Sequence, residues 1–278
     1  MTAEWQVDFY RRPVRTDLGE VAWELVICNR DEAVSVFVPQ SQANSVWVAA
    51  QFRQATERFG WPERISVFRP QVVELLQAAC NSIEDKAIAL HPSRHTPELK
   101  AHLQARARQY PELSGYTGQS YDPLDVEPGP PQPLPETVRG DRWQFSTLTC
   151  SDLEGFLERT IPFVGGVEVS QLRGLPAETS IPGLTMYGGR KSLLLARWCD
   201  RVQPYTLRYI PGQPDGMVLD AGLSDRWVLA TFDDAEVASA AQKYEGRRHV
   251  SRGWHFLVVM PDDSGATVTG IWLLRDEM

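Results

Sequence analysis

The chain has 278 residues, and its 28 Lys and Arg against 36 Asp and Glu give a formal net charge of −8. Hydrophobic residues make up 42 % and charged residues 23 %, which is typical of globular domains and excludes a disordered or fibrous chain. No apolar run reaches the ~20 residues of a membrane-spanning helix, and the N-terminal sequence resembles neither a signal peptide nor a transit segment. We therefore expect a soluble, cytoplasmic protein of about two domains, without membrane insertion.

Residues 1–110 predict alternating strands and helices. Apolar residues alternate with polar ones near 5–9, 23–27 and 34–38, which predicts three half-buried strands. The expected elements that follow are a helix over about 43–59 ended by Gly60, a strand at 65–68, a helix from Pro70, a short buried strand at 87–90, and a helix capped by Thr96. The order βββαβαβα is that of a ribonuclease H-like domain, with a generic α/β domain as the alternative.

Residues 111–140 predict a linker between two domains. Residues 111–135 contain seven of the 20 prolines, and proline removes a backbone donor and restricts the residue before it. The net charge is 0 over 1–110, −4 over 111–140 and −4 over 141–278. We expect an N-terminal α/β domain at 1–110 and a C-terminal mixed α+β domain at 141–278.

The C-terminal half predicts further strands and helices. The expected elements are a strand at 143–148, a helix capped by Ser151 with Glu154, a helix over about 191–202, strands at 205–210, 216–221 and 226–232, a helix capped by Asp233 with Glu236 and stopped by Gly246, and strands at 254–260 and 268–274.

A ribonuclease H-like order raises the question of two-metal nuclease chemistry, which needs several converging carboxylates. Asp8 in the first strand and Glu57 in the first helix are candidates, but the fourth strand ends at Arg69, where a cation would compete with a metal ion. The five histidines show no metal-site spacing, and no phosphate-binding loop or nucleophile motif is present. We expect no metal, no cofactor and no catalytic residue. The four cysteines form no CxxC pair and predict small buried side chains.

Three basic clusters are candidate contacts for nucleic acid. Two glycines precede Arg190 and Lys191 at a predicted helix N-terminus, which would attract phosphate. The other two clusters comprise Arg247, Arg248, Arg252, Trp254 and His255, and the region of the third helix with Arg94 and Arg106. Arginine binds phosphate and aromatic rings stack on bases in single-stranded RNA, although each cluster could also be a solvated charged face.

Several strings of the sequence resemble the Tab/Atab-type RNA-binding proteins. They are DFYRRP (8–13), WELVIC (23–28), FRPQ (68–71), IPGLTMYGGRKSLLLARW (181–198), RWVLATF (226–232), WHFLVVM (254–260) and GIWLLRD (270–276). The family is marked by a C-terminal Trp-Leu-Leu, here Trp272, Leu273 and Leu274. Trp272 stands in a predicted strand, so we expect it to be at least partly structural.

The resemblance implies a non-catalytic RNA-binding factor of the cyanobacterial form. Plant and algal members are chloroplast factors that bind A/U-rich leader RNA and support translation of photosystem I reaction-centre mRNA and photosystem assembly. The expected partner is therefore single-stranded A/U-rich RNA. Two alternatives stay open: a protein-interaction factor that recruits translation or photosystem assembly components, and a metal-dependent nuclease using Asp8 and Glu57.

Overall fold

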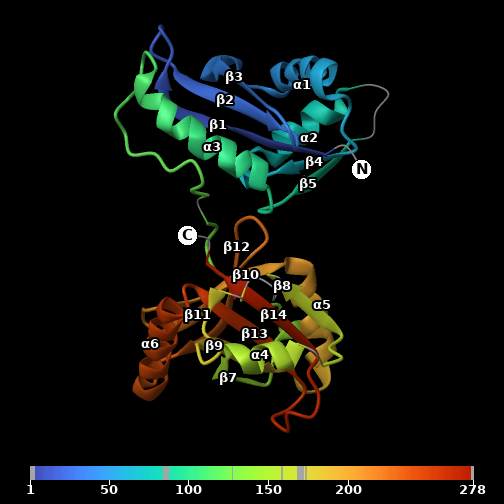
Figure 1. Cartoon of the computed structure of the whole chain (residues 1–278), viewed down its shortest axis with the longest axis vertical. Coiled ribbons are helices and arrows are strands. Elements are labelled where there is room, and N and C mark those ends of the chain that lie inside the picture. The colour runs from blue at the N-terminus through green and yellow to red at the C-terminus, as the bar shows by residue number, and fades with distance from the viewer. Residues whose placement is uncertain are drawn as a thin grey trace. The chain divides into compact units, whose positions relative to one another are not determined.

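The computed structural model describes residues 4–83, 88–126, 128–157, 159–167, 172 and 174–276. The chain divides into two compact units, Met1–Glu127 and Pro128–Met278 (Figure 1). Each unit combines β-sheet with helices and has apolar cores of its own. The predicted mixed α/β class is therefore confirmed.

The first unit is a five-stranded mixed sheet with helices on both faces. Its elements are β1 (Glu4–Arg15), β2 (Val21–Cys28), β3 (Ala33–Pro39), α1 (Ser45–Phe59), β4 (Arg64–Val67), α2 (Val73–Asn81), β5 (Ala89–Pro92) and α3 (Pro97–Gln109). The strands lie in the order β3-β2-β1-β4-β5; β1, β2 and β3 pair antiparallel, and β4 and β5 run parallel to β1. The element order βββαβαβα is as expected, and the ribonuclease H-like class stays a prediction.

Alternation along β1 decides which side chains meet which helices, because successive side chains of a strand point to opposite faces. Trp5, Val7 and Phe9 pack in one core with α1 and α2. Gln6 and Asp8 point to the other face, which α3 covers in Figure 1. The two faces of this sheet therefore hold different kinds of core: one apolar, the other containing buried charges.

The first part of the predicted linker packs on the first unit. Arg15 N donates to Gly115 O at 2.8 Å. The buried guanidinium of Arg69 donates to Pro123 O at 2.5 Å and to Asp125 O at 2.6 Å. Backbone carbonyls of this proline-rich stretch are thus satisfied by donors of the first unit instead of by a strand ladder.

The second unit contains two sheets. Its elements are β6 (Gln132–Pro133), β7 (Arg142–Thr149), α4 (Cys150–Leu157), β8 (Phe163–Gly166), β9 (Ser180–Tyr187), α5 (Ser192–Val202), β10 (Pro204–Ile210), β11 (Asp215–Ala221), β12 (Asp225–Phe232), α6 (Ala235–Val250), β13 (Trp254–Met260) and β14 (Gly270–Arg275). One sheet has the order β7-β9-β13-β14-β8 and the other β10-β11-β12-β6. Apolar residues of α4 pack on one face of the five-stranded sheet, and α5, α6 and the four-stranded sheet pack on its other face.

The second part of the predicted linker belongs to this unit. β6 is an edge strand parallel to β12, a position that tolerates Pro133. Leu134 and Val138 are buried in the larger core. The stretch 111–140 is therefore divided between the two units.

Some strands differ from the sequence prediction. β8 and β9 are not among the predicted strands, although β9 lies inside the five-stranded sheet and is buried along almost its whole length. The short strand expected at 87–90 is found as β5 at Ala89–Pro92, and Ala87 lies outside the described residues. β5 is mostly exposed rather than buried, because it is an edge strand with a neighbour on one side.

Three helix termini also correct the prediction. The reciprocal cap of α4 joins Thr149 and Asp152: Asp152 N donates to Thr149 Oγ1 at 3.1 Å, and Thr149 N donates to Asp152 Oδ2 at 3.4 Å. The expected cap joined Ser151 to Glu154, whose side chain lies outside the described residues. The N-cap of α6 is Asp234 instead of Asp233. Thr96 is the N-cap of α3 but makes no side-chain cap bond. Gln6 Oε1 of β1 accepts from Leu99 N instead, at 3.0 Å.

Helix α6 continues past Gly246, which was expected to stop it, to Val250. Tyr244 OH and Arg248 Nη1 donate to Leu207 O of β10 at 2.9 and 2.7 Å. These contacts hold the last turns on the sheet and outweigh the ~1 kcal/mol that an interior glycine costs a helix.

Candidate nucleic-acid interface

The nuclease candidate Asp8 lies in a buried ion network. Its carboxylate pairs with Arg12 Nη2 at 2.8 Å and Arg69 Nε at 3.0 Å. Arg12 also pairs with Glu24 at 2.9 Å, and Tyr121 OH accepts from Arg12 Nη1 at 2.8 Å. Arginines thus occupy the space beside Asp8 that a metal ion would need, as the position of Arg69 in the sequence suggested.

The second nuclease candidate lies elsewhere. Glu57 is exposed on α1, whereas Asp8 points to the face that α3 covers. The two carboxylates are therefore separated by the sheet and cannot share an ion. Within the described part of the chain, no three His, Cys, Asp or Glu side chains are arranged to hold a metal.

The candidates near α3 are tied into the same network. Arg106 pairs with Glu24 Oε1 at 2.5 Å, and Tyr110 OH donates to Glu24 Oε2 at 2.5 Å. Burial raises the pKa of Tyr110 above its ordinary value, so this phenol stays a donor. Arg94 is half-buried. Arg106 therefore has a structural partner and is not a freely presented contact for RNA.

Two members of the 247–255 cluster are core residues. Trp254 is 2 % exposed and packs with Phe256 and Leu273. His255 is fully buried: Nδ1 donates to Gly253 O at 2.8 Å and Nε2 accepts from Leu207 N at 2.9 Å. This corrects the prediction, because neither ring is accessible to a base.

The remaining residues of this cluster lie around the end of α6. Arg248 is paired with Glu245 at 2.8 Å and with Asp276 at 3.4 Å. Arg247 is exposed and donates to Thr147 Oγ1 at 2.9 Å, and Arg252 is exposed in a left-handed backbone conformation. Arg247 and Arg252 are thus the members of this cluster that present charge to solvent.

Arg190 and Lys191 are exposed in a 3₁₀ turn, Gly189–Lys191, directly before α5. Lys191 Nζ donates to Glu136 O at 3.2 Å. The Asp141 carboxylate lies so close to Gly189 that a Cβ there would clash with it. A negative group therefore already occupies the helix start that was expected to attract phosphate.

The two C-terminal clusters do not converge. Strands β9 and β13 are parallel, with Tyr187 paired to Met260. Arg190 follows the end of β9, whereas Arg247 and Arg252 precede the start of β13. The seven residues of β13 separate the clusters by about 20 Å along the strand.

Helix α5 carries a basic face that is not among the predicted clusters. Arg197 and Arg201 are exposed on this helix, and Leu193 and Leu194 are 49 % and 51 % exposed. Leu194, Arg197 and Arg201 follow one another at intervals of three and four residues, which places them on one side of α5, and Arg190 lies in the 3₁₀ turn directly before the helix. The sequence contains this spacing, but it does not show which side of the helix faces solvent.

The Trp-Leu-Leu motif has a structural role, as expected. Trp272 and Leu274 of β14 lie in the core with α5, and Leu273 lies in the core with α4. A Cβ at Gly165 or Gly270 would lie 2.6 Å from the Trp272 indole. Both glycines therefore leave room for this ring at the centre of the unit.

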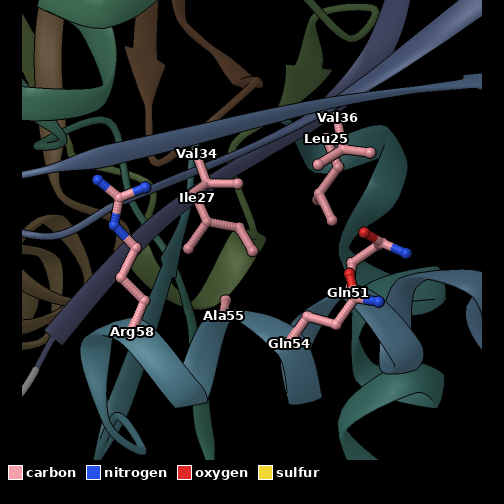
Figure 2. Close-up of a pocket in the computed structure, with 8 residues that line it drawn as sticks. All are labelled: Leu25, Ile27, Val34, Val36, Gln51, Gln54, Ala55 and Arg58. Atoms are coloured by element: carbon pink, nitrogen blue, oxygen red, sulfur yellow. The ribbon is translucent and has the colours of Figure 1, made fainter.

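A small hollow lies between the sheet and α1 in the first unit (Figure 2). Val34 and Val36 of β3 line one wall together with Leu25 and Ile27 of β2, and α1 lines the other with Gln51, Gln54, Ala55 and Arg58. Its volume is about 100 Å³, below the ~300 Å³ typical of small-molecule sites.

The four cysteines are free and buried, which confirms the prediction. Burial raises the pKa of Cys28 to about 12 and that of Cys80 to about 11, so both stay protonated thiols. Among the described residues, no helix combines the length and apolar character that crossing a bilayer requires.

Solved structures resemble the chain only weakly. A simian T-cell lymphotropic virus intasome complex and the HTLV-2 integrase catalytic core align with 40 % and 41 % of this chain and with 43 % and 76 % of theirs. Sequence identities are 15 % and 16 %, and the TM-scores of 0.28 and 0.27 are too low to indicate a shared fold.

The sequence comparisons are more specific. Two plant proteins named "Protein TAB2 homolog, chloroplastic", from Arabidopsis thaliana and Zea mays, are 29 % and 28 % identical over 98 % of this chain and over 74 % and 71 % of their own lengths. The family model for the RNA-binding protein Tab2/Atab2 N terminus matches residues 4–106, and the model for the C-terminal domain matches 121–275. The chain therefore belongs to the Tab2/Atab2 family of RNA-binding proteins.

Proposed function

We propose that this protein is a non-catalytic RNA-binding factor for A/U-rich single-stranded RNA, which supports translation of photosystem I reaction-centre mRNA and photosystem biogenesis. The observation that carries the proposal is the match of both family models, which together extend through both units. The plant relatives, named as chloroplastic TAB2 homologues, support the same reading over almost the whole chain.

The charge distribution supports a narrow contact surface on an acidic protein. The chain carries a net charge of −8, and this charge argues against a broad basic surface that binds nucleic acid without specificity. The predicted contacts that remain exposed and available to phosphate are Arg190, Lys191, Arg247 and Arg252. Trp254, His255 and Arg106 are not part of the proposed interface.

The buried network around Asp8 supports a non-catalytic role. Three arginines neutralise Asp8 and Glu24, and Glu57 lies on the other side of the sheet. The alternative of a nuclease built on Asp8 and Glu57 has no geometric support.

A binding titration tests the proposal. The full chain is titrated into fluorescently labelled A/U-rich and G/C-rich single strands of equal length, between ~50 and ~200 mM salt. We expect tighter binding to the A/U-rich strand, and log Kd to rise with log salt with a slope of about 2 for three phosphate contacts. Absence of affinity at low salt would contradict RNA binding, and equal affinity for both strands would contradict the A/U preference.

A further inference from the structure

Helix α5 presents a fixed outward surface. Its inner side is anchored in the core of the second unit by Leu195, Ala196, Trp198 and Cys199, all of which are buried. Gln203, in the left-handed conformation, ends the helix, and its backbone N–H bonds to Cys199 O. Because the inner side is packed, the positions of the outward side chains along the helix are set before any partner binds.

The outward side combines positive charge with apolar surface. Arg197 and Arg201 are one turn apart, about 6 Å along the axis, and Arg190 lies in the 3₁₀ turn before the first residue of the helix. No ion pair within the described residues joins these three arginines to a carboxylate, although Asp200 is exposed on the same helix. Leu193 and Leu194, each about half exposed, lie between the arginines.

We propose that the outward side of α5, formed by Leu193, Leu194, Arg197 and Arg201, together with Arg190 in the turn before the helix, is the surface that binds single-stranded RNA. This rests on the RNA-binding function proposed above. A row of arginines complements a phosphate backbone, and guanidinium planes also stack on unpaired bases. The two leucines provide apolar contact for the bases of a single strand, whose faces are not covered by stacking in a duplex.

The alternative surface at the end of α6 is weaker. Arg248 is neutralised there by Glu245 and Asp276, and Trp254 and His255 are buried. The outward side of α5 offers more exposed arginine and, unlike the end of α6, two adjacent exposed leucines.

The double variant Arg197→Gln/Arg201→Gln of the full chain tests this surface. Labelled A/U-rich and mixed-sequence single strands are titrated at several salt concentrations. We expect roughly tenfold weaker binding at low salt and a salt slope lower by about 1.4, because two phosphate contacts are lost. Leu193→Ser/Leu194→Ser is expected to weaken binding without changing the slope, since it removes no charge.

The matched control is Arg53→Gln/Arg64→Gln, which removes two exposed arginines from the first unit. It should bind like the wild type, and all variants should melt at the wild-type temperature. If the wild type binds RNA and the α5 variant and the control bind it with the same affinity, the proposed surface is overturned but the RNA function is not. Absence of wild-type binding to both RNAs would overturn the RNA function and the surface with it.

Discussion

At the residue scale, side chains of types that often catalyse reactions or bind ligands have structural roles in this protein. Asp8, Glu24 and His255 have the chemistry of catalytic or binding groups, yet each is buried and satisfied by partners distant in sequence. His255 illustrates the reason. Its acceptor nitrogen receives Leu207 N from β10, so it joins the two sheets of the second unit. Nothing near residue 255 in the sequence indicates that contact.

His255 gives the protein a pH-dependent stability. Burial lowers its pKa to about 4, below the ordinary value of 6.5, because the charged imidazolium is poorly solvated there. The unfolded chain therefore binds a proton that the folded chain excludes, and stability falls as pH drops from about 6.5 toward 4. The expected loss is about 2 kcal/mol in the free energy of unfolding, measured by urea denaturation at pH 7 and pH 4.5.

The control for this prediction is His255→Gln, whose amide oxygen can still accept from Leu207 N. The variant should be less stable than the wild type at pH 7. Its free energy of unfolding should fall less on acidification, since the glutamine side chain cannot be protonated. Other groups titrate equally in both proteins, so the difference isolates residue 255. Identical pH profiles for the two proteins would show that His255 is not the source.

At the element scale, the hydrophobic period predicts where helices and strands lie better than it predicts how they end. The alternation in β1 and the apolar positions of α1 indicate both elements and their inward faces correctly. The end of a helix depends on one or two hydrogen bonds from a capping side chain, and neighbouring residues of the same type can each form them. Asp233 and Asp234 are equally good caps by composition, but only Asp234 has its Oδ1 within 3.0 Å of Glu236 N and Val237 N.

The two aspartates before α6 make a matched test. We expect Asp234→Ala to lower the free energy of unfolding by about 1 kcal/mol, because two N–H groups of the first turn lose their acceptor. Asp233→Ala should change it by less than ~0.5 kcal/mol, as an exposed substitution away from the cap. Urea denaturation of both variants measures the difference in the free energy of unfolding. Equal losses in the two variants would mean that both aspartates cap the helix.

At the scale of the whole molecule, the proline-rich stretch belongs to the units it connects. Composition predicts a linker over 111–140, but Pro123 O and Asp125 O accept from the buried Arg69. Leu134 and Val138 complete the core of the second unit. Prolines are compatible with this, because a stretch with little regular secondary structure can still bury side chains and carbonyls.

Fragments with different boundaries test that division. We expect 128–278 to unfold cooperatively and to be about 3–6 kcal/mol more stable than 141–278, which lacks the buried Leu134 and Val138 and the edge strand β6. Urea denaturation followed by tryptophan fluorescence measures both. Equal stability of the two fragments would show that residues 128–140 act only as a connection.

The sequence by itself determined the mixed α/β class, most of the elements, the faces of the amphipathic strands and helices, and the family. These follow from local periodicity and from strings of residues in order, which need no knowledge of distant contacts. Only the tertiary structure decided which polar and aromatic residues reach solvent: it buried Trp254 and His255, committed Arg106 to Glu24, and left the arginines of α5 exposed. The physical reason is that burial is produced by partners far along the chain, whereas a sequence pattern reports only neighbours.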